Sequence, residues 1–119
     1  MNIEEYRDYC LGFPEVTESF PFDDKVLVFK VANKMFALAD VDEFQSINLK
    51  CDPERAIQLR EEYHEIIAGY HMNKKHWNTV DMKGSLSDEF IRELIDHSYD
   101  LIVSGLPKKV QALINDQRS

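Results

Sequence analysis

Two short apolar runs with three residues between them constrain the fold of this chain more than any other feature. The runs are VLVFKV (26–31) and MFALA (35–39), and they flank Ala32, Asn33 and Lys34. Their β-branched and aromatic side chains favour extended backbone, and Asn readily adopts the positive φ of a tight turn. The pattern therefore predicts a β-hairpin.

Further strands are expected on both sides of this hairpin. From Thr17 onward the pattern alternates, with Phe20 and Phe22 on one side and Pro21 between them, which is typical of an edge strand or a bent strand. A run at 46–50 follows an acidic loop and predicts a fourth strand. Four antiparallel strands in sequence order would form a β-meander.

Helices are expected at the start of the chain and in its second half. Residues with strong helix-start character are Asn2, Asp52, Ser87 and Pro107. After Ser87, apolar residues recur at helical spacing from Ile91 to Ile102, which predicts the main core helix. Residues 66–69 are expected to turn the chain after the second helix, and residues 77–82 to form a short strand or a wing-like loop.

Length and composition narrow the class of protein. A chain of 119 residues predicts one domain over residues 1–119. It contains no apolar run of about 18 residues and no signal-peptide pattern, so no membrane partner is expected. Cys10 and Cys51 lack metal-site or disulfide-framework spacing, which favours a reducing cytoplasm.

The segment from Gly69 to Gly84 is the best candidate site. It contains the only Trp of the chain and two of its four His, and it carries three Lys against one acid in a chain of net charge -8. Its KKHW run (74–77) combines ammonium groups, an imidazole and an indole, which together can hold phosphate and stack a base. In the competing interpretation, Trp77 and Tyr70 are core anchors with polar partners nearby.

Catalytic and metal-binding patterns are weak. His71 and His76 are five residues apart and lack the Glu of HExxH. Cys51 precedes a helix start, which favours a thiolate, but Asp52 opposes that effect. Phosphate-binding, dinucleotide-binding and nucleophile-elbow motifs are absent from the sequence. We therefore predict no catalytic residue, no metal and no cofactor.

Several ordered blocks resemble the MmcQ/YjbR family of small bacterial proteins. The blocks are FPEVTESFPF (13–22), VFKVANKMFAL (28–38), NLKCDPERAIQLR (48–60), GYHMNKKHWNTV (69–80) and residues 84–109. The resemblance implies an α+β fold with an N-terminal helix and a curved antiparallel sheet packed against C-terminal helices. It also implies likeness to a double-wing DNA-binding fold. Asp23 and Asp24 replace a usual Gly, and Ala68 replaces a usual Pro.

Two main functional hypotheses follow, and a third, an enzyme that uses His71 or His76, has no catalytic motif to support it. The first is a DNA-binding protein that uses a local basic surface. Its predicted contacts are Lys30, Lys34, Lys50, Asn73, Lys74, Lys75, His76, Trp77 and Lys83. The second is a small-molecule or protein-interaction domain. Its predicted pocket is lined by Tyr70, His71, Asn73, Trp77 and Asn78.

Overall fold

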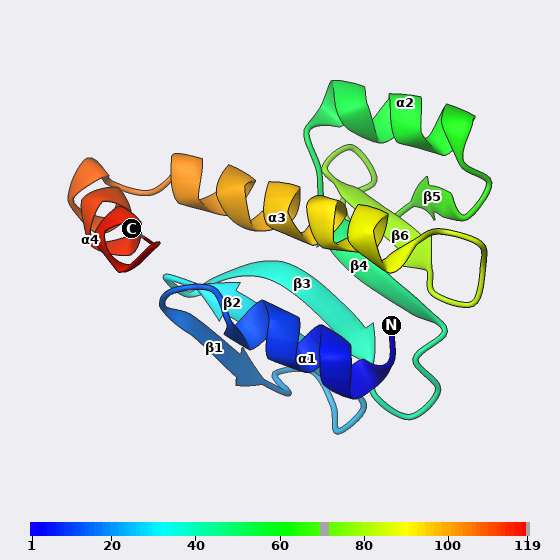
Figure 1. The fold of residues 1–119 in the computed structure, drawn as a ribbon, viewed down its shortest axis with the longest axis horizontal. Helices are drawn as coiled ribbons and strands as arrows, with labels where there is room; N and C mark the ends of the chain where they lie inside the picture. The colour runs from blue at the N-terminus through cyan, green and yellow to red at the C-terminus, as the bar shows by residue number, and fades with distance from the viewer. Residues whose placement is uncertain (70–71, 119) are drawn as a thin grey trace.

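The computed structural model describes residues 1–69 and 72–118. In chain order the elements are α1 (Ile3–Leu11), β1 (Val16–Ser19), β2 (Val26–Val31), β3 (Lys34–Asp40), β4 (Ser46–Lys50), α2 (Pro53–Glu62), β5 (Ile66–Ala68), β6 (Trp77–Asp81), α3 (Asp88–Ser104) and α4 (Lys108–Arg118). The strands form one antiparallel sheet in the order β1-β2-β3-β4-β6-β5 (Figure 1). The predicted α+β class is confirmed.

The predicted hairpin is confirmed as β2 and β3. Its turn contains only Ala32 and Asn33, at φ 50° and 64°, and Lys34 already pairs with Val31. Two consecutive residues at positive φ are typical of the two-residue turn that matches the twist of a hairpin. The register shifts between Phe29 and Lys30, so Phe36 on β3 has no partner on β2. An extra residue of this kind is a β-bulge, which bends the strand.

The meander is also confirmed, but its first strand ends earlier than predicted. β1 ends at Ser19, so Phe20, Pro21 and Phe22 lie in the loop before β2. Phe20 and Phe22 are 48% and 63% exposed. The interpretation of these residues as a strand was wrong, because the pairing of β1 with β2 stops at Ser19 and Val28.

The turn predicted at 66–69 was wrong as well. Ile66–Ala68 is strand β5, and it pairs with β6 at the edge of the sheet. Gly69 follows this strand and lies very close to Trp77. A Cβ atom added at Gly69 would lie 2.7 Å from the Trp77 Cβ. β6 therefore pairs with β4 on one side and β5 on the other, which confirms the predicted strand at 77–82.

The helices start where their caps predicted. Side chains of Asn2, Asp52 and Ser87 each accept a hydrogen bond from a backbone N–H in the first turn of α1, α2 and α3. α3 crosses the sheet over β3 and β4, with α1 alongside it (Figure 1). None of the helices in the described part of the chain combines the length and apolar character needed to cross a membrane.

The core lies between the helices and one face of the sheet. Its largest fully buried side chains include Tyr6, Phe29, Phe36 and Tyr99. The buried face of α3 differs in part from the predicted one, because Tyr99 and Val103 are buried, whereas Leu101, which was predicted on this face, is only half-buried. On α4, Ile114 is buried but Leu113 is 53% exposed, so only part of the apolar side of this helix contacts the core.

The opposite face of the sheet carries a smaller apolar cluster. Val28, Leu38 and Trp77 are buried there, with Val26, Met35 and Met72 packed around them. On β2, Val26 and Val28 of this cluster alternate with Leu27 and Phe29 of the main core, as the period of two in a strand requires. This second face positions the candidate site.

Candidate functional site

A hollow of about 460 Å³ opens where β3 and β4 separate. It is lined by Met35 and Trp77 of this second face and also by Ile102 of α3, which belongs to the main core. The pairing of these strands covers only Ala37–Ala39 and Ile47–Leu49, so their ends at Met35 and Lys50 are not paired with each other. The nine described residues that line the hollow are Pro21, Phe22, Lys30, Asn33, Lys34, Met35, Lys50, Trp77 and Ile102. We call this site the lysine hollow.

Three lysines from three strands converge at the lysine hollow. Lys30 lies on β2, Lys34 begins β3 and Lys50 ends β4. The nine described lining residues include no Asp and no Glu. The hollow is therefore a local cationic site in a chain of net charge -8.

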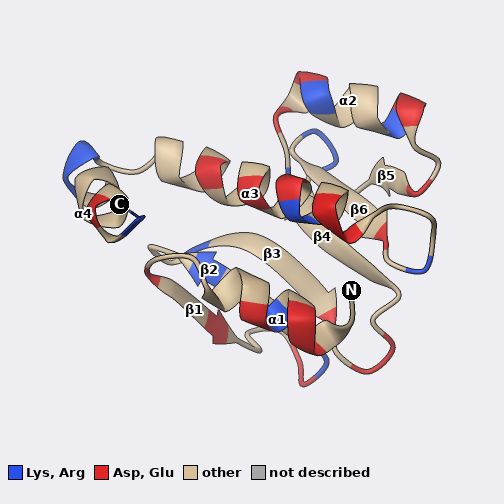
Figure 2. Ribbon diagram, viewed as in Figure 1, with Lys and Arg blue, Asp and Glu red and all other residues tan. Residues whose placement is uncertain are grey.

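The acidic residues are concentrated elsewhere. Figure 2 shows Asp and Glu along α1 and α3, on the helix side of the sheet. At the other end of the open face, Glu65 and Asp81 line a separate hollow with His64. A polyanion would therefore be attracted to the lysine hollow and repelled by the acidic surfaces of α1 and α3.

Trp77 forms part of the wall of the lysine hollow but is mainly a core residue. Only 8% of it is exposed, and it packs with Val28 and Leu38. The prediction that Trp77 anchors the core is confirmed. Little of its indole is free to stack on a ligand, whereas Phe22 on the rim of the same hollow is 63% exposed.

The loop before β6 carries more of the predicted basic residues. Lys74 and Lys75 are exposed and His76 is half-buried. Asn73 organises this turn, because its Oδ1 accepts a hydrogen bond from Lys75 N at 3.0 Å and its carbonyl accepts from Trp77 N at 3.0 Å. The loop leads directly into Trp77, at the edge of the lysine hollow.

Lys83 lies away from the other predicted lysines. It follows the opposite end of β6 and lines a hollow with Glu5, Asp42 and Glu43. The two ends of β6 are roughly 13 Å apart along the strand, with Trp77 at one end and Lys83 beyond the other. The structure thus brings together Lys30, Lys34, Lys50 and Trp77, with the Asn73–His76 loop beside them, and separates Lys83.

The alternative pocket is divided between the two faces of the sheet. Trp77 packs on the open face, whereas the adjacent Asn78 lines a cavity on the helix side. Neighbouring strand residues point to opposite faces, so these two side chains cannot line one pocket. Tyr70 and His71 lie outside the described residues. The Asn73 side chain already accepts a hydrogen bond from Lys75 N within its own turn.

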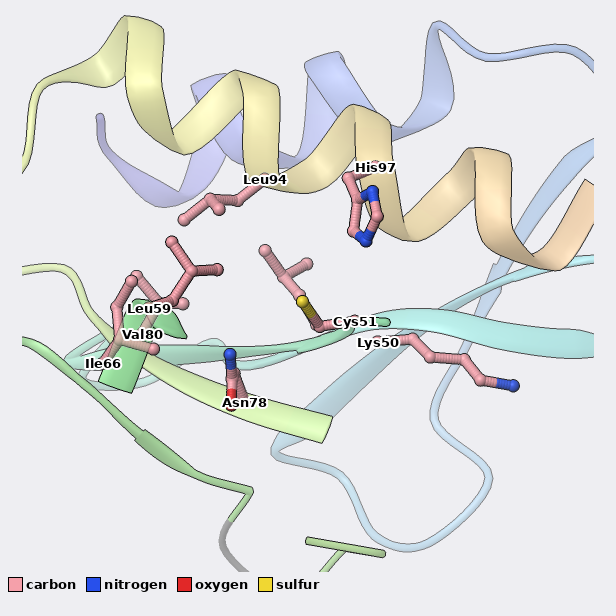
Figure 3. A pocket seen from close by; sticks show the side chains of 9 residues that line it. Lys50, Cys51, Leu59, Ile66, Asn78, Val80, Leu94 and His97 are labelled. Atoms are coloured by element: carbon pink, nitrogen blue, oxygen red, sulfur yellow. The ribbon is translucent and has the colours of Figure 1, made fainter. Parts of the chain in front are cut away.

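The cavity on the helix side is about 10 Å³, close to the size of one water molecule. Its wall includes Cys51, Asn78 and His97, and the Lys50 ammonium points away from it (Figure 3). Arg60 Nε donates to Asn78 Oδ1 at 2.7 Å, which directs the amide nitrogen into the cavity. Among the described residues, Asn78 Nδ2 has no hydrogen-bond partner.

Cys51 is a buried thiol. Burial raises its pKa, and the Asp52 carboxylate acts in the same direction, while Arg55 opposes them. The macrodipole of α2 therefore does not make a reactive thiolate here. Cys51 is free and packs as a small residue in the core. No group of three potential metal ligands occurs within residues 1–69 and 72–118.

His97 links α3 to the start of α2. Its Nε2 accepts a hydrogen bond from Asp52 N at 3.2 Å, so it is neutral in this arrangement. Burial lowers the His97 pKa from 6.5, and the nearby Arg55 guanidinium lowers it further, against the opposing Asp52 and Asp100 carboxylates. Sequence reasoning missed His97, because its partner lies 45 residues away.

The lowered pKa of His97 predicts a pH-dependent stability. The unfolded chain takes up this proton near pH 6.5 and the native protein only at lower pH, so the free energy of unfolding should fall as the pH drops below about 6.5. His97→Gln retains an acceptor and should reduce this pH dependence between about pH 7 and pH 5 in urea titrations. His64→Gln is the control, and an unchanged slope in His97→Gln would contradict the assignment.

Comparisons with known proteins decide the family. The YjbR family model matches residues 11–101. This chain belongs to the YjbR family. Uncharacterized protein YjbR of Escherichia coli K12 is 36% identical over 115 residues, covering 96% of this chain and 98% of that protein. Uncharacterized protein YbdF of Escherichia coli O157:H7 is 38% identical over 109 residues, covering 91% of this chain and 89% of that protein.

Solved structures agree with the YjbR assignment. The crystal structure of the Deinococcus radiodurans protein DR2400, with domain DUF419, superposes with a TM-score of 0.88 at 38% identity, over 96% of this chain and 88% of that one. A Pseudomonas syringae protein superposes with a TM-score of 0.71 at 29% identity, over 85% of this chain and 98% of that one. The curated YjbR relatives carry no enzymatic name, and their printed names assign no ligand.

Proposed function

We propose that this YjbR-family protein binds DNA at the lysine hollow. The observation that supports the proposal is the convergence of Lys30, Lys34 and Lys50 on one concave surface without a lining carboxylate. Lysine ammonium groups neutralise phosphates, and this contact supplies most of the affinity of weak DNA binding. The double-wing likeness noted from the sequence is in keeping with this proposal.

The loop of Lys74 and Lys75 would extend this surface. Both residues are exposed, and their loop adjoins Trp77 in the wall of the hollow. A DNA backbone crossing the hollow toward β6 would meet these two ammonium groups next. The acidity of α1 and α3 would then disfavour DNA over these two helices, because like charges repel it.

Salt dependence tests the proposal. Fluorescence anisotropy would follow a labelled DNA of about 20 nucleotides, as a single strand and as a duplex, from about 20 to 200 mM KCl. With three phosphate contacts, we expect log affinity to fall with log salt at a slope of about -2 to -3 for at least one form. Lys34→Ala should reduce the slope by about 0.7–0.9.

Lys83→Ala is the matched control. It removes the same charge from an exposed position outside the lysine hollow, so the slope should stay at the wild-type value. If neither the single strand nor the duplex binds at the lowest salt concentration, the proposal is contradicted. An equal effect of Lys34→Ala and Lys83→Ala would show attraction without a defined site and would also overturn it.

A further inference from the structure

We infer that the lysine hollow takes single-stranded DNA, with a base stacked on Phe22 while the lysines contact the phosphates. This inference rests on the proposed function and adds the form of the ligand. Phe22 is 63% exposed and lines the same hollow as Lys30, Lys34 and Lys50. Exposed aromatic rings beside a cationic groove are the general means of binding single strands, because every base offers a π-face.

Hydrogen bonds within the loop that carries Phe22 hold the conformation of that loop. Asp23 Oδ1 accepts hydrogen bonds from Lys25 N at 2.9 Å and Val26 N at 2.8 Å. These hydrogen bonds from backbone N–H groups to the Asp23 side chain tie the residue after Phe22 to the start of β2. The ring is therefore presented on a defined turn, which lowers the entropy cost of binding a base against it.

The charges around Phe22 favour a base beside the ring and a phosphate beside the lysines. Asp23 and Asp24 follow Phe22 directly and are exposed, so a phosphate beside the ring would be repelled. The three lysines lie at other positions around the same hollow. A nucleotide fits this arrangement with its neutral base against Phe22 and its phosphate toward the lysines.

A duplex fits this face less well. Duplex bases are stacked on one another and expose only their edges, so Phe22 could reach a π-face only by unstacking a base. The helices, which could enter a major groove, pack on the other face of the sheet, where α1 and α3 are acidic. The hollow of about 460 Å³ is in the size range of sites that enclose small organic molecules. That room suits a nucleotide unit better than a double helix.

The test compares an oligo-dT strand of about 12 nucleotides with a duplex of the same length, by anisotropy at about 20 mM KCl. We expect tighter binding of the single strand. Phe22→Ala should weaken that binding roughly 5- to 150-fold, as measured for the loss of one stacked base, and Phe22→Trp should retain it. Leu113→Ala, at an exposed apolar residue on α4, should leave the affinity unchanged.

The outcomes separate this inference from the proposed function. Duplex binding at least as tight as single-strand binding would overturn the inference. So would an unchanged single-strand affinity in Phe22→Ala alongside weakened binding in Lys34→Ala, and in both cases the proposed function would stand. Binding of neither DNA would overturn both proposals. Thermal unfolding of Phe22→Ala checks that an affinity loss is not a folding defect, and the exposure of Phe22 predicts an unchanged midpoint.

Discussion

Replacing Arg60 with alanine should lower the free energy of unfolding by about 3 kcal/mol, because it removes charge-assisted hydrogen bonds and leaves a buried amide with less hydrogen bonding. Arg60 Nε donates to Asn78 Oδ1 at 2.7 Å, and its Nη2 donates to the carbonyls of Trp77 and Lys74. Asn78 is only 2% exposed, so solvent cannot replace the lost donor.

Urea titration followed by the fluorescence of Trp77, the only tryptophan, measures this loss. The midpoint should fall while the m-value stays constant, as for a change in stability alone. Arg55→Ala on the same helix is the control, and it should change the free energy by less than about 1 kcal/mol. A loss in Arg60→Ala no larger than in Arg55→Ala would show that the Arg60 hydrogen bonds contribute little.

Arg60 also connects folding to the proposed site. Its contacts with Lys74 and Trp77 hold the loop that carries the exposed lysines against the start of β6. Arg60→Lys keeps the charge but has no planar fork to reach several acceptors, so it should restore only part of the stability.

Replacing Ser98 with alanine should lower the free energy of unfolding by about 2–4 kcal/mol, since it leaves two buried backbone groups without their partner. Ser98 Oγ accepts a hydrogen bond from Lys50 N at 2.9 Å and donates one to Phe36 O at 2.5 Å. These groups lie just beyond the last paired residues of β3 and β4. The hydroxyl of α3 thus joins two strands where they separate beside the lysine hollow.

Ser104→Ala provides the matched comparison on the same helix. Its hydroxyl donates only to the nearby Leu101 carbonyl, and the residue is exposed. We expect a change within about 0.5 kcal/mol for Ser104→Ala, because exposed positions away from such features tolerate substitution. Equal unfolding free energies for the two variants would refute the bridging role of Ser98. The same urea titration measures both.

Much of the fold followed from local patterns. The β2–β3 hairpin depends on two extended runs and a turn residue that accepts positive φ, and the helix starts depend on caps within a few residues. β5 was missed because three residues carry too little periodic signal, and Ile66–Ala68 becomes a strand only through pairing with β6. Phe20 and Phe22 alternate like a strand but have no partner strand in the described pairing.

The candidate site was only partly predictable. The basic character of the segment around Lys74 and Lys75 is visible in the chain, as is the role of Trp77 as an anchor. The separation of Lys83 from the other lysines is not visible in the chain, because it depends on the course of β6. Phe22 has no local feature that assigns it to the hollow, and Arg60 acts through residues 14 to 18 positions away.

The sequence by itself determined the α+β class, the hairpin, the helix caps and the resemblance to the YjbR family, since each depends on neighbouring residues or on ordered blocks. Only the tertiary structure decided that Lys30, Lys34, Lys50 and Phe22 meet at one hollow while Asn78 turns to the opposite side of the sheet. The physical reason is that strand pairing and the separation of β3 from β4 set which distant side chains share a face, and no single segment encodes that arrangement.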